Sequence, residues 1–336
     1  MADLIKTGTC LLPIFFFLAA LVFLDSFKLL KIRSILLALF AGCIAGGLCY
    51  LLYNALFGLT SVDRITYTKY ISPLYEETIK ALYLWLLFAR RRIGFIVDSA
   101  IYGFAIGAGF ATIENVYVLQ TLPDPNPLVW VIRGFGTAVM HGASTALVAI
   151  FTKMLLDRSG WKRIMPYLPG LLAAIVLHSI FNHFILPPDL ITMVQLVLYP
   201  LILFMAFEYS ERMLRDWLEQ GLDQDVAMLE SIRAGQFSET PAGRYLNSLR
   251  TRFPGEVVAD MLCYLRIHKE LAIRAKGILL MRESGFQVPL DPVLKEKFTE
   301  LRFLEKSIGK TGKLALAPIL FKSTRELWQL YLVEGR

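Results

Sequence analysis

The stretch that decides the fold is residues 94–120, GFIVDSAIYGFAIGAGFATIENVYVLQ. It is long enough to cross the hydrocarbon core of a bilayer, which needs about 20 apolar residues. It nevertheless contains Asp98 and Glu114, and an ionisable side chain in hydrocarbon costs about 2.5–3.5 kcal/mol. Small residues that allow close helix approach lie on the same stretch, namely Gly103, Gly107 and Gly109. We therefore predict a membrane helix that packs against other helices and keeps its polar groups away from lipid.

The composition of the whole chain supports a membrane protein. Of the 336 residues, 56% are hydrophobic and 19% are charged, and the mean hydropathy is +0.54. A soluble domain has about 25% charged residues, so an ordinary cytosolic enzyme and a disordered chain are both excluded. The charges are uneven: residues 1–209 carry 15 Lys/Arg and 11 Asp/Glu, and residues 210–336 carry 20 and 17. We predict a transmembrane domain over 1–209 and a cytoplasmic helical domain over 210–336.

The apolar segments predict an all-α polytopic fold with about seven transmembrane helices. The segments are roughly 9–24, 34–57, 70–89, 94–120, 128–154, 167–186 and 190–209. In the second domain, residues 212–219 are expected to continue the last membrane helix, and amphipathic helices are expected over 225–233, 255–281 and 291–307. This domain contains no catalytic motif, and we expect it to be a regulatory module or a docking site for a cytoplasmic partner. Its net charge of only +3, with both signs interleaved, gives no indication of nucleic-acid binding.

The basic residues orient the predicted helices. Clusters that fall on one side of the membrane are Lys28, Lys31 and Arg33, then Arg90–Arg92, then Lys153, Arg158, Lys162 and Arg163, then Arg212 and Arg215. Because cytoplasmic loops are enriched in Lys and Arg, we expect the N-terminus outside and the C-terminus in the cytoplasm. The four cysteines have no CxxC spacing, so neither a disulfide framework nor a cysteine metal site is expected.

Ionisable residues on four predicted helices share one depth in the membrane. They are Glu76, Glu77 and Lys80, then Glu114, then His141, then His178. At 1.5 Å per residue, these groups lie between about 9 and 20 Å below the outer surface. Such a narrow band predicts one shared cavity. The alternative is a buried ion cluster that only holds the helices together.

The residue types in this band are those of a metal-dependent hydrolase. Catalytic zinc sites have three protein ligands from imidazole and carboxylate groups, which predicts Glu114, His141 and His178 as ligands of Zn²⁺. A second carboxylate, Glu76, is predicted to take the proton from the attacking water, with Glu77 beside it. Asn182, four residues after His178, is predicted to donate a hydrogen bond to the oxyanion.

Other polar residues have simpler interpretations. We expect Asp98 to cap its helix or neutralise the Arg90–Arg92 loop, Arg133 to pair with Glu114 or to extend toward the interface, and Asn115 to bond across helices. His183 is expected at the interface and His268 on the surface of the second domain.

Four motifs occur in order on four successive predicted helices: Glu76-Glu77-x-x-Lys80, Phe110-Ala-Thr-Ile-Glu114-Asn115, His141-Gly142-x-Ser144 and His178-x-x-x-Asn182. With these motifs, residues 1–209 resemble the PrsW family of intramembrane proteases and, more distantly, the type II CAAX prenyl endopeptidases. The resemblance implies an endopeptidase of the bacterial inner membrane that cuts a membrane-anchored protein such as an anti-sigma factor. It also implies that Glu76 and Glu77 are the paired glutamates of the family and His178 its essential histidine. The CAAX-type enzymes have histidine at the position of Glu114.

Three alternatives to this interpretation have their own signatures. A CAAX-type protease acting on lipidated substrates requires a cavity open to the cytoplasm, which the predicted depths disfavour. An ion- or proton-coupled transporter usually has an internal repeat with broken helices, and the sequence has none. A non-catalytic membrane scaffold would bind no metal.

For the protease, the substrate helix must unwind locally, since a helical carbonyl is already hydrogen-bonded.

Overall fold

The computed structural model describes residues 2–25, 30–57, 62–123, 126–159, 165–284, 286 and 292–320. No strand occurs among these residues, and the predicted all-α class is confirmed. The chain divides into two compact units, Met1–Ser210 and Glu211–Arg336. Lys28, Lys162 and Arg163, which contributed to the predicted orientation, lie outside the described residues, as do residues 321–336.

The first unit consists of long apolar helices with short connections. Its α-helices are α1 (Ala2–Leu24), α2 (Ile32–Phe57), α3 (Arg64–Thr66), α4 (Ser72–Ala89), α5 (Ile96–Thr121), α6 (Pro127–Val131), α7 (Ala138–Ser159), α8 (Leu168–Asn182) and the first part of α9 (Pro188–Arg233). Two π-helical segments, η1 (Tyr67–Ile71) and η2 (Ile132–Thr137), lead into α4 and α7, and the 3₁₀ turn η3 (Met165–Tyr167) leads into α8. Single π-helical turns, such as η1 and η2, are frequent at functional sites.

Within the described residues, six helical stretches are long and apolar enough to cross a membrane. They are Asp3–Leu24, Ile32–Ala55, Ile96–Thr121, Pro127–Asp157, Met165–Asn182 and Pro188–Arg233. The seventh predicted segment, 70–89, forms helix α4, which at about 27 Å is nearly as long as the bilayer core is thick. Its 18 residues include three charged side chains, Glu76, Glu77 and Lys80, whereas each of the six stretches has an 18-residue window with at most two. The count of seven crossings stays a prediction.

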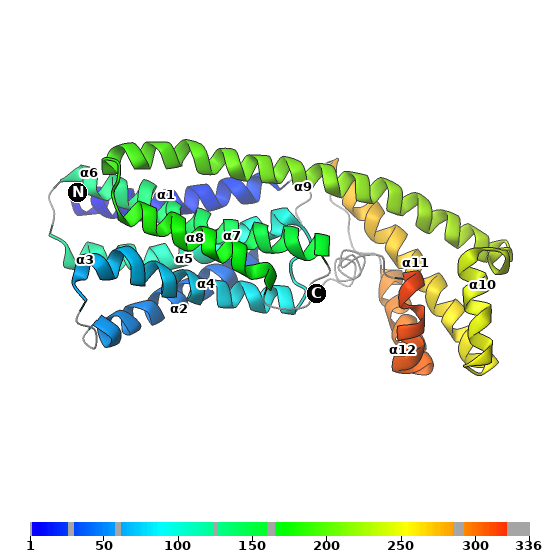
Figure 1. The fold of residues 1–336 in the computed structure, drawn as a ribbon. Coiled ribbons are helices and arrows are strands. Elements are labelled where there is room, and N and C mark those ends of the chain that lie inside the picture. The colour runs from blue at the N-terminus through cyan, green and yellow to red at the C-terminus, as the bar shows by residue number, and fades with distance from the viewer. Residues whose placement is uncertain are drawn as a thin grey trace. The chain divides into compact units, whose positions relative to one another are not determined.

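Helix α5 is the centre of the bundle. Its neighbours are α1, α2, α4 and α7, and α8 packs against α4 and α7 (Figure 1). Close approach depends on glycine: a Cβ atom at Gly107 would lie 2.2 Å from the carbonyl oxygen of His141 on α7. On the side of α2, a Cβ atom at Gly109 would lie 1.9 Å from the carbonyl oxygen of Leu39. Helix α5 is buried from Ile96 to Ala111, as expected for a membrane helix surrounded by protein.

The described residues of the second unit form helices joined by short turns. It comprises the end of α9, then α10 (Pro241–Ser248), α11 (Gly255–Glu283) and α12 (Pro292–Leu320), with 3₁₀ turns before and after α10. The helices expected separately over 212–219 and 225–233 are one, because α9 runs to Arg233 without a break. Leucine, isoleucine and aromatic side chains of α11 and α12 form its core.

Buried charge in the second unit gathers around one carboxylate. Asp225 lies 2.7 Å from the Nζ atom of Lys269 and 2.6 Å from that of Lys276, and all three residues are buried. His268, beside Lys269 on α11, is only 1% exposed. The prediction that His268 lies on the surface was wrong, because His268 lies in the middle of the buried face of α11, opposite the exposed face that carries Cys263 and Arg266.

Candidate active site

A buried chain of charges centred on Glu77 forms the core of the site. Its Oε1 atom lies 2.7 Å from the Nζ atom of Lys80, one turn further along α4, and 2.8 Å from Nδ1 of His178 on α8. Ser144 of α7 adds a hydroxyl 3.4 Å from both oxygens of Glu77. Glu77, Lys80 and Ser144 are buried, so water does not compete for these contacts. The spacing of three residues places Glu77 and Lys80 on one face of α4, which allows this pair.

His141 extends this chain toward α5. The Nζ atom of Lys80 lies 3.2 Å from Nδ1 of His141, and Nε2 of the same ring lies 2.7 Å from Oε2 of Glu114. Because an ammonium group only donates, this arrangement favours the tautomer in which Nδ1 accepts and Nε2–H donates to Glu114. The rings of His141 and His178 meet edge to face, with their centroids 4.7 Å apart.

Arg133 closes the chain at the other oxygen of Glu114. Its Nη2 atom lies 3.0 Å from Oε1 of Glu114, which confirms one of the two interpretations of Arg133. Its Nε donates to the side chain of Asn115, whose own amide donates to the carbonyl oxygen of Cys10 on α1. Asn115 therefore bonds across helices, as predicted. Asp98, in the first turn of α5, accepts from the backbone N–H groups of Gly94 and Phe95, and it therefore caps the helix as predicted.

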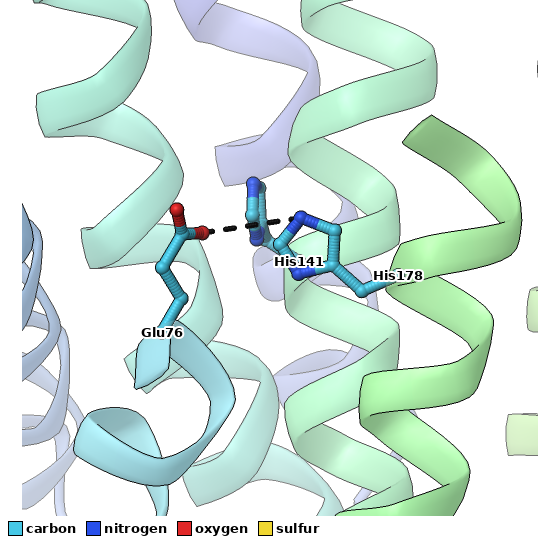
Figure 2. Close-up of side chains that lie close together, drawn as sticks. All are labelled: Glu76, His141 and His178. Carbon is cyan, nitrogen blue, oxygen red and sulfur yellow. Dashed lines mark ion pairs between the residues drawn. The ribbon is translucent and has the colours of Figure 1, made fainter. Parts of the chain in front are cut away.

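Glu76 points from α4 toward the two imidazoles (Figure 2). Its Oε2 atom lies 3.9 Å from Nε2 of His178, and its Oε1 atom accepts a hydrogen bond from Ser72. One ligand atom from each of Glu76, His141 and His178 lies within 4.8 Å of the other two. Among the described residues, this is the group arranged to hold a metal ion. The predicted ligand set has Glu114 in place of Glu76, and the structure brings both glutamates to the histidines.

The residues present fit a metal ion. Two imidazoles and a carboxylate are suitable ligands for Zn²⁺ and related ions. The Nδ1 atom of His178 is committed to the carboxylate of Glu77, and this leaves Nε2 to face Glu76. A ligating histidine commonly donates its second ring nitrogen to a carboxylate in this way, which selects its tautomer and orientation.

Pro73 explains how α4 and α8 are aligned. A proline has no N–H, so the carbonyl oxygen four residues earlier loses its α-helical donor. In the π-helical segment η1, where Ser72 N–H bonds five residues back to Tyr67, the oxygen five residues before Pro73 also lacks its donor. These are the oxygens of Lys69 and Thr68, and they accept instead from the Ser179 hydroxyl at 2.7 Å and the Asn182 amide at 3.0 Å. Asn182 is therefore engaged with the backbone of η1, and its role as an oxyanion donor stays a prediction. The third membrane histidine, His183, stays outside the cluster, with its ring against Tyr70.

A cavity of about 460 Å³ reaches the site from one end of the bundle. Three helical faces line it: the last turns of α2, the segment from Arg64 to Glu76, and the last turns of α5. The two glutamates Glu76 and Glu114 lie in its wall. The Arg90–Arg92 loop follows the opposite end of α4, so the cavity opens at the end of the bundle away from this basic cluster.

Sequence reasoning assigned no role to two hydroxyl groups of the site, although Ser144 belongs to one of the four motifs. Ser72 precedes Glu76 by one helical turn, and Ser144 follows His141 by three residues. In each case the spacing places the hydroxyl on the same helical face as the functional group, which is the signal that identifies it.

A polar cluster of glutamates and histidines lies inside a bundle of membrane-spanning helices and is reached by a cavity, which is the arrangement expected of an intramembrane hydrolase. The model of the PrsW family intramembrane metalloprotease matches residues 31–207, more than half of the chain, and the chain belongs to this family. The protein is therefore an integral membrane protein and an intramembrane protease. No curated protein and no solved structure matches it.

Proposed function

We propose that this protein is an endopeptidase that hydrolyses a peptide bond of a membrane-anchored protein, with a metal ion, Zn²⁺, held by Glu76, His141 and His178. The observation that carries the proposal is the arrangement of His178: Glu77 holds its Nδ1 atom, and its Nε2 atom faces Glu76 beside His141. This assignment exchanges the predicted roles of the two glutamates, because Glu76 is the one that lies close to both imidazoles.

A zinc ion bound by these residues supplies Lewis acidity to the scissile carbonyl group and to the attacking water. Glu114 is the remaining carboxylate in the cavity wall, and Arg133 holds its Oε1 atom. Its Oε2 atom accepts from Nε2 of His141 in the structure. A metal ion held at Nε2 would require the ring proton on Nδ1 and the ammonium group of Lys80 turned away from it. Oε2 of Glu114 would then be free to accept a proton from water and to pass it to the leaving nitrogen.

The position of the cavity supports cleavage near the outer face of the bacterial inner membrane. It opens at the end of the bundle opposite Arg90–Arg92, and basic loops are cytoplasmic in bacterial membrane proteins. We propose that the N-terminus lies outside, that the C-terminus lies in the cytoplasm, and that the cut falls in the outer part of the substrate's span. An anti-sigma-factor-like regulator is the class of substrate proposed, and the second unit is proposed to bind a cytoplasmic partner.

The experiment is metal analysis of the purified, detergent-solubilised protein with parallel cleavage of a single-span reporter in liposomes. The wild type is expected to hold one zinc and to cut the reporter. Glu76→Gln and His178→Ala should lose both the metal and cleavage, whereas Glu114→Gln should keep the metal and lose cleavage. The matched control is His183→Ala, a membrane histidine outside the cluster, which should behave as wild type.

Two results would contradict the proposal. Metal retained in Glu76→Gln and lost in Glu114→Gln would restore the original assignment of the glutamates. A wild-type protein that cuts the reporter after complete metal removal would show that the carboxylates act without a metal.

A further inference from the structure

The cavity beside the two glutamates is shaped by three helical faces at regular spacing. Arg64, Thr68, Ser72 and Glu76 follow one another every four residues along the segment that becomes α4. Facing them, α5 contributes Phe110, Glu114 and Tyr117, and α2 contributes its own stripe. Polar groups thus run along one wall, and they end at Glu76 in the candidate active site. The other two walls carry mainly aromatic and apolar side chains, with Glu114 and Gln120 as the polar residues of α5.

The wall from α2 contains a gap at Gly47. A Cβ atom at Gly47 would meet no heavy atom within 4 Å, although the residue lines the cavity. Its neighbour Gly46 differs, because a Cβ atom there would lie 3.0 Å from Cβ of Ile113 and 3.2 Å from the carbonyl oxygen of Phe110. Gly46 is therefore explained by helix packing, and Gly47 leaves space that no residue of the bundle fills.

Aromatic rings surround this space. Tyr50 lies on α2 one turn from Gly47, and its ring is 4.9 Å from that of Tyr117 on α5. Phe110 joins the cavity to the site, since its ring centroid lies 4.9 Å from that of His141. Ligand pockets of 300–1,000 Å³ are typically lined by such apolar and aromatic groups with a few polar ones. The cavity, at about 460 Å³, belongs to this class.

We propose that this cavity is the subsite for a bulky apolar side chain of the substrate, next to the scissile bond, and that Gly47 determines how large this side chain can be. The inference rests on the proposed endopeptidase function and deepens it. The polar stripe from Arg64 to Glu76 provides partners for the substrate backbone, whose own hydrogen bonds open when its helix unwinds. Gly47 is a specificity-determining residue and has no side chain that takes part in proton transfer.

The test compares wild type, Gly47→Ala and Gly47→Phe on a family of single-span reporters in liposomes. The reporters differ in one residue flanking the cut, which is Ala, Leu, Phe or Trp. Wild type should prefer the large residues. Gly47→Phe should cut the Phe and Trp reporters at least about 10-fold more slowly and retain cleavage of the Ala reporter, since filling an apolar pocket changes discrimination by 10- to 200-fold. Gly47→Ala should cut the Phe and Trp reporters at rates between those of wild type and Gly47→Phe.

A second readout does not depend on cleavage. A photo-cross-linking phenylalanine at the varied position of the reporter should label residues 46–53 or 110–117 of wild type, and the label should disappear in Gly47→Phe. The matched control is Gly8→Phe, in the outer half of α1, where a Cβ atom makes only an ordinary contact, 3.6 Å from Leu12. This variant should keep both the labelling and the preference of wild type.

The outcomes separate the subsite from the proposed function. Cleavage with unchanged preference in Gly47→Phe, or labelling outside the cavity, would overturn the subsite. Absence of cleavage by wild type, together with labelling of the cavity that is lost in Gly47→Phe, would support the subsite and overturn the proteolytic function.

Discussion

The Nδ1 atom of His178 lies 2.8 Å from Oε1 of Glu77, and both side chains are buried. This contact joins α4 to α8 and decides which nitrogen of His178 is available as a ligand. Glu77 also compensates the buried ammonium group of Lys80. The carboxylate of Glu77 thus orients His178 and also neutralises Lys80. Different variants can separate these two effects.

We expect Glu77→Ala to weaken metal binding about 10- to 100-fold, because His178 loses the group that orients it. It should also destabilise the protein by about 3–5 kcal/mol, since Lys80 is left buried without its carboxylate. The double variant Glu77→Ala/Lys80→Met removes that charge and should regain most of the stability while binding metal as weakly as Glu77→Ala. Titration with zinc and thermal unfolding in detergent measure the two effects. Wild-type metal affinity in the double variant would show that Glu77 acts only by neutralising Lys80.

Ser179→Ala should destabilise the protein by about 1–3 kcal/mol, because the carbonyl oxygen of Lys69 loses its donor. In a Pro73→Ala background the same change should cost much less, since residue 73 then provides a backbone N–H group. The measurement is a double-mutant cycle of unfolding free energies. Thr78→Ala is the control, because its hydroxyl bonds within α4 to the carbonyl oxygen of Leu74 and should not couple to Pro73. Equal costs of Ser179→Ala in both backgrounds would refute this account of the proline.

Gly107→Ala should destabilise the bundle by about 1–3 kcal/mol and weaken metal binding. The added methyl group would lie 2.2 Å from the carbonyl oxygen of His141, so α7 must shift and carry its imidazole with it. Metal content and thermal unfolding report the two effects. Gly8→Ala, where the methyl group has room beside Leu12, should change neither quantity. Unaltered stability of Gly107→Ala would mean that α5 and α7 are less closely packed than described.

Acidification should destabilise the second unit between about pH 6.5 and pH 3. Burial lowers the pKa of His268 from its ordinary 6.5 to about 3, so the folded unit keeps the ring neutral while an unfolded chain binds a proton. Because the unfolded state binds more protons in this window, stability falls as pH falls, by at most about 1.4 kcal/mol per pH unit from this group. Hydrogen exchange of α11 in the full-length protein measures the effect. The slope should diminish in His268→Gln, and an unchanged slope would assign the acid sensitivity to other groups.

The sequence by itself determined the all-α membrane fold, the approximate helix ranges and the residues that gather in the site. These properties are local or nearly so: a run of apolar residues is either long enough to span hydrocarbon or not, and the rise of 1.5 Å per residue places Glu76, Glu114 and His178 at similar depths. The motifs on four helices identified the family for the same reason, since each motif lies within one helix.

Only the tertiary structure decided which atoms meet. The rotation of α4, α5, α7 and α8 about their axes depends on glycine contacts and on Pro73, and it puts Glu76 close to both imidazoles while Glu114 pairs with Arg133. The tertiary structure also decided that the Asn182 amide donates to the carbonyl oxygen of Thr68, which Pro73 leaves without a backbone donor. The burial of His268 follows from the packing around α11. Spacing along one helix places side chains on a face, but the neighbour that this face meets is a property of the packed bundle.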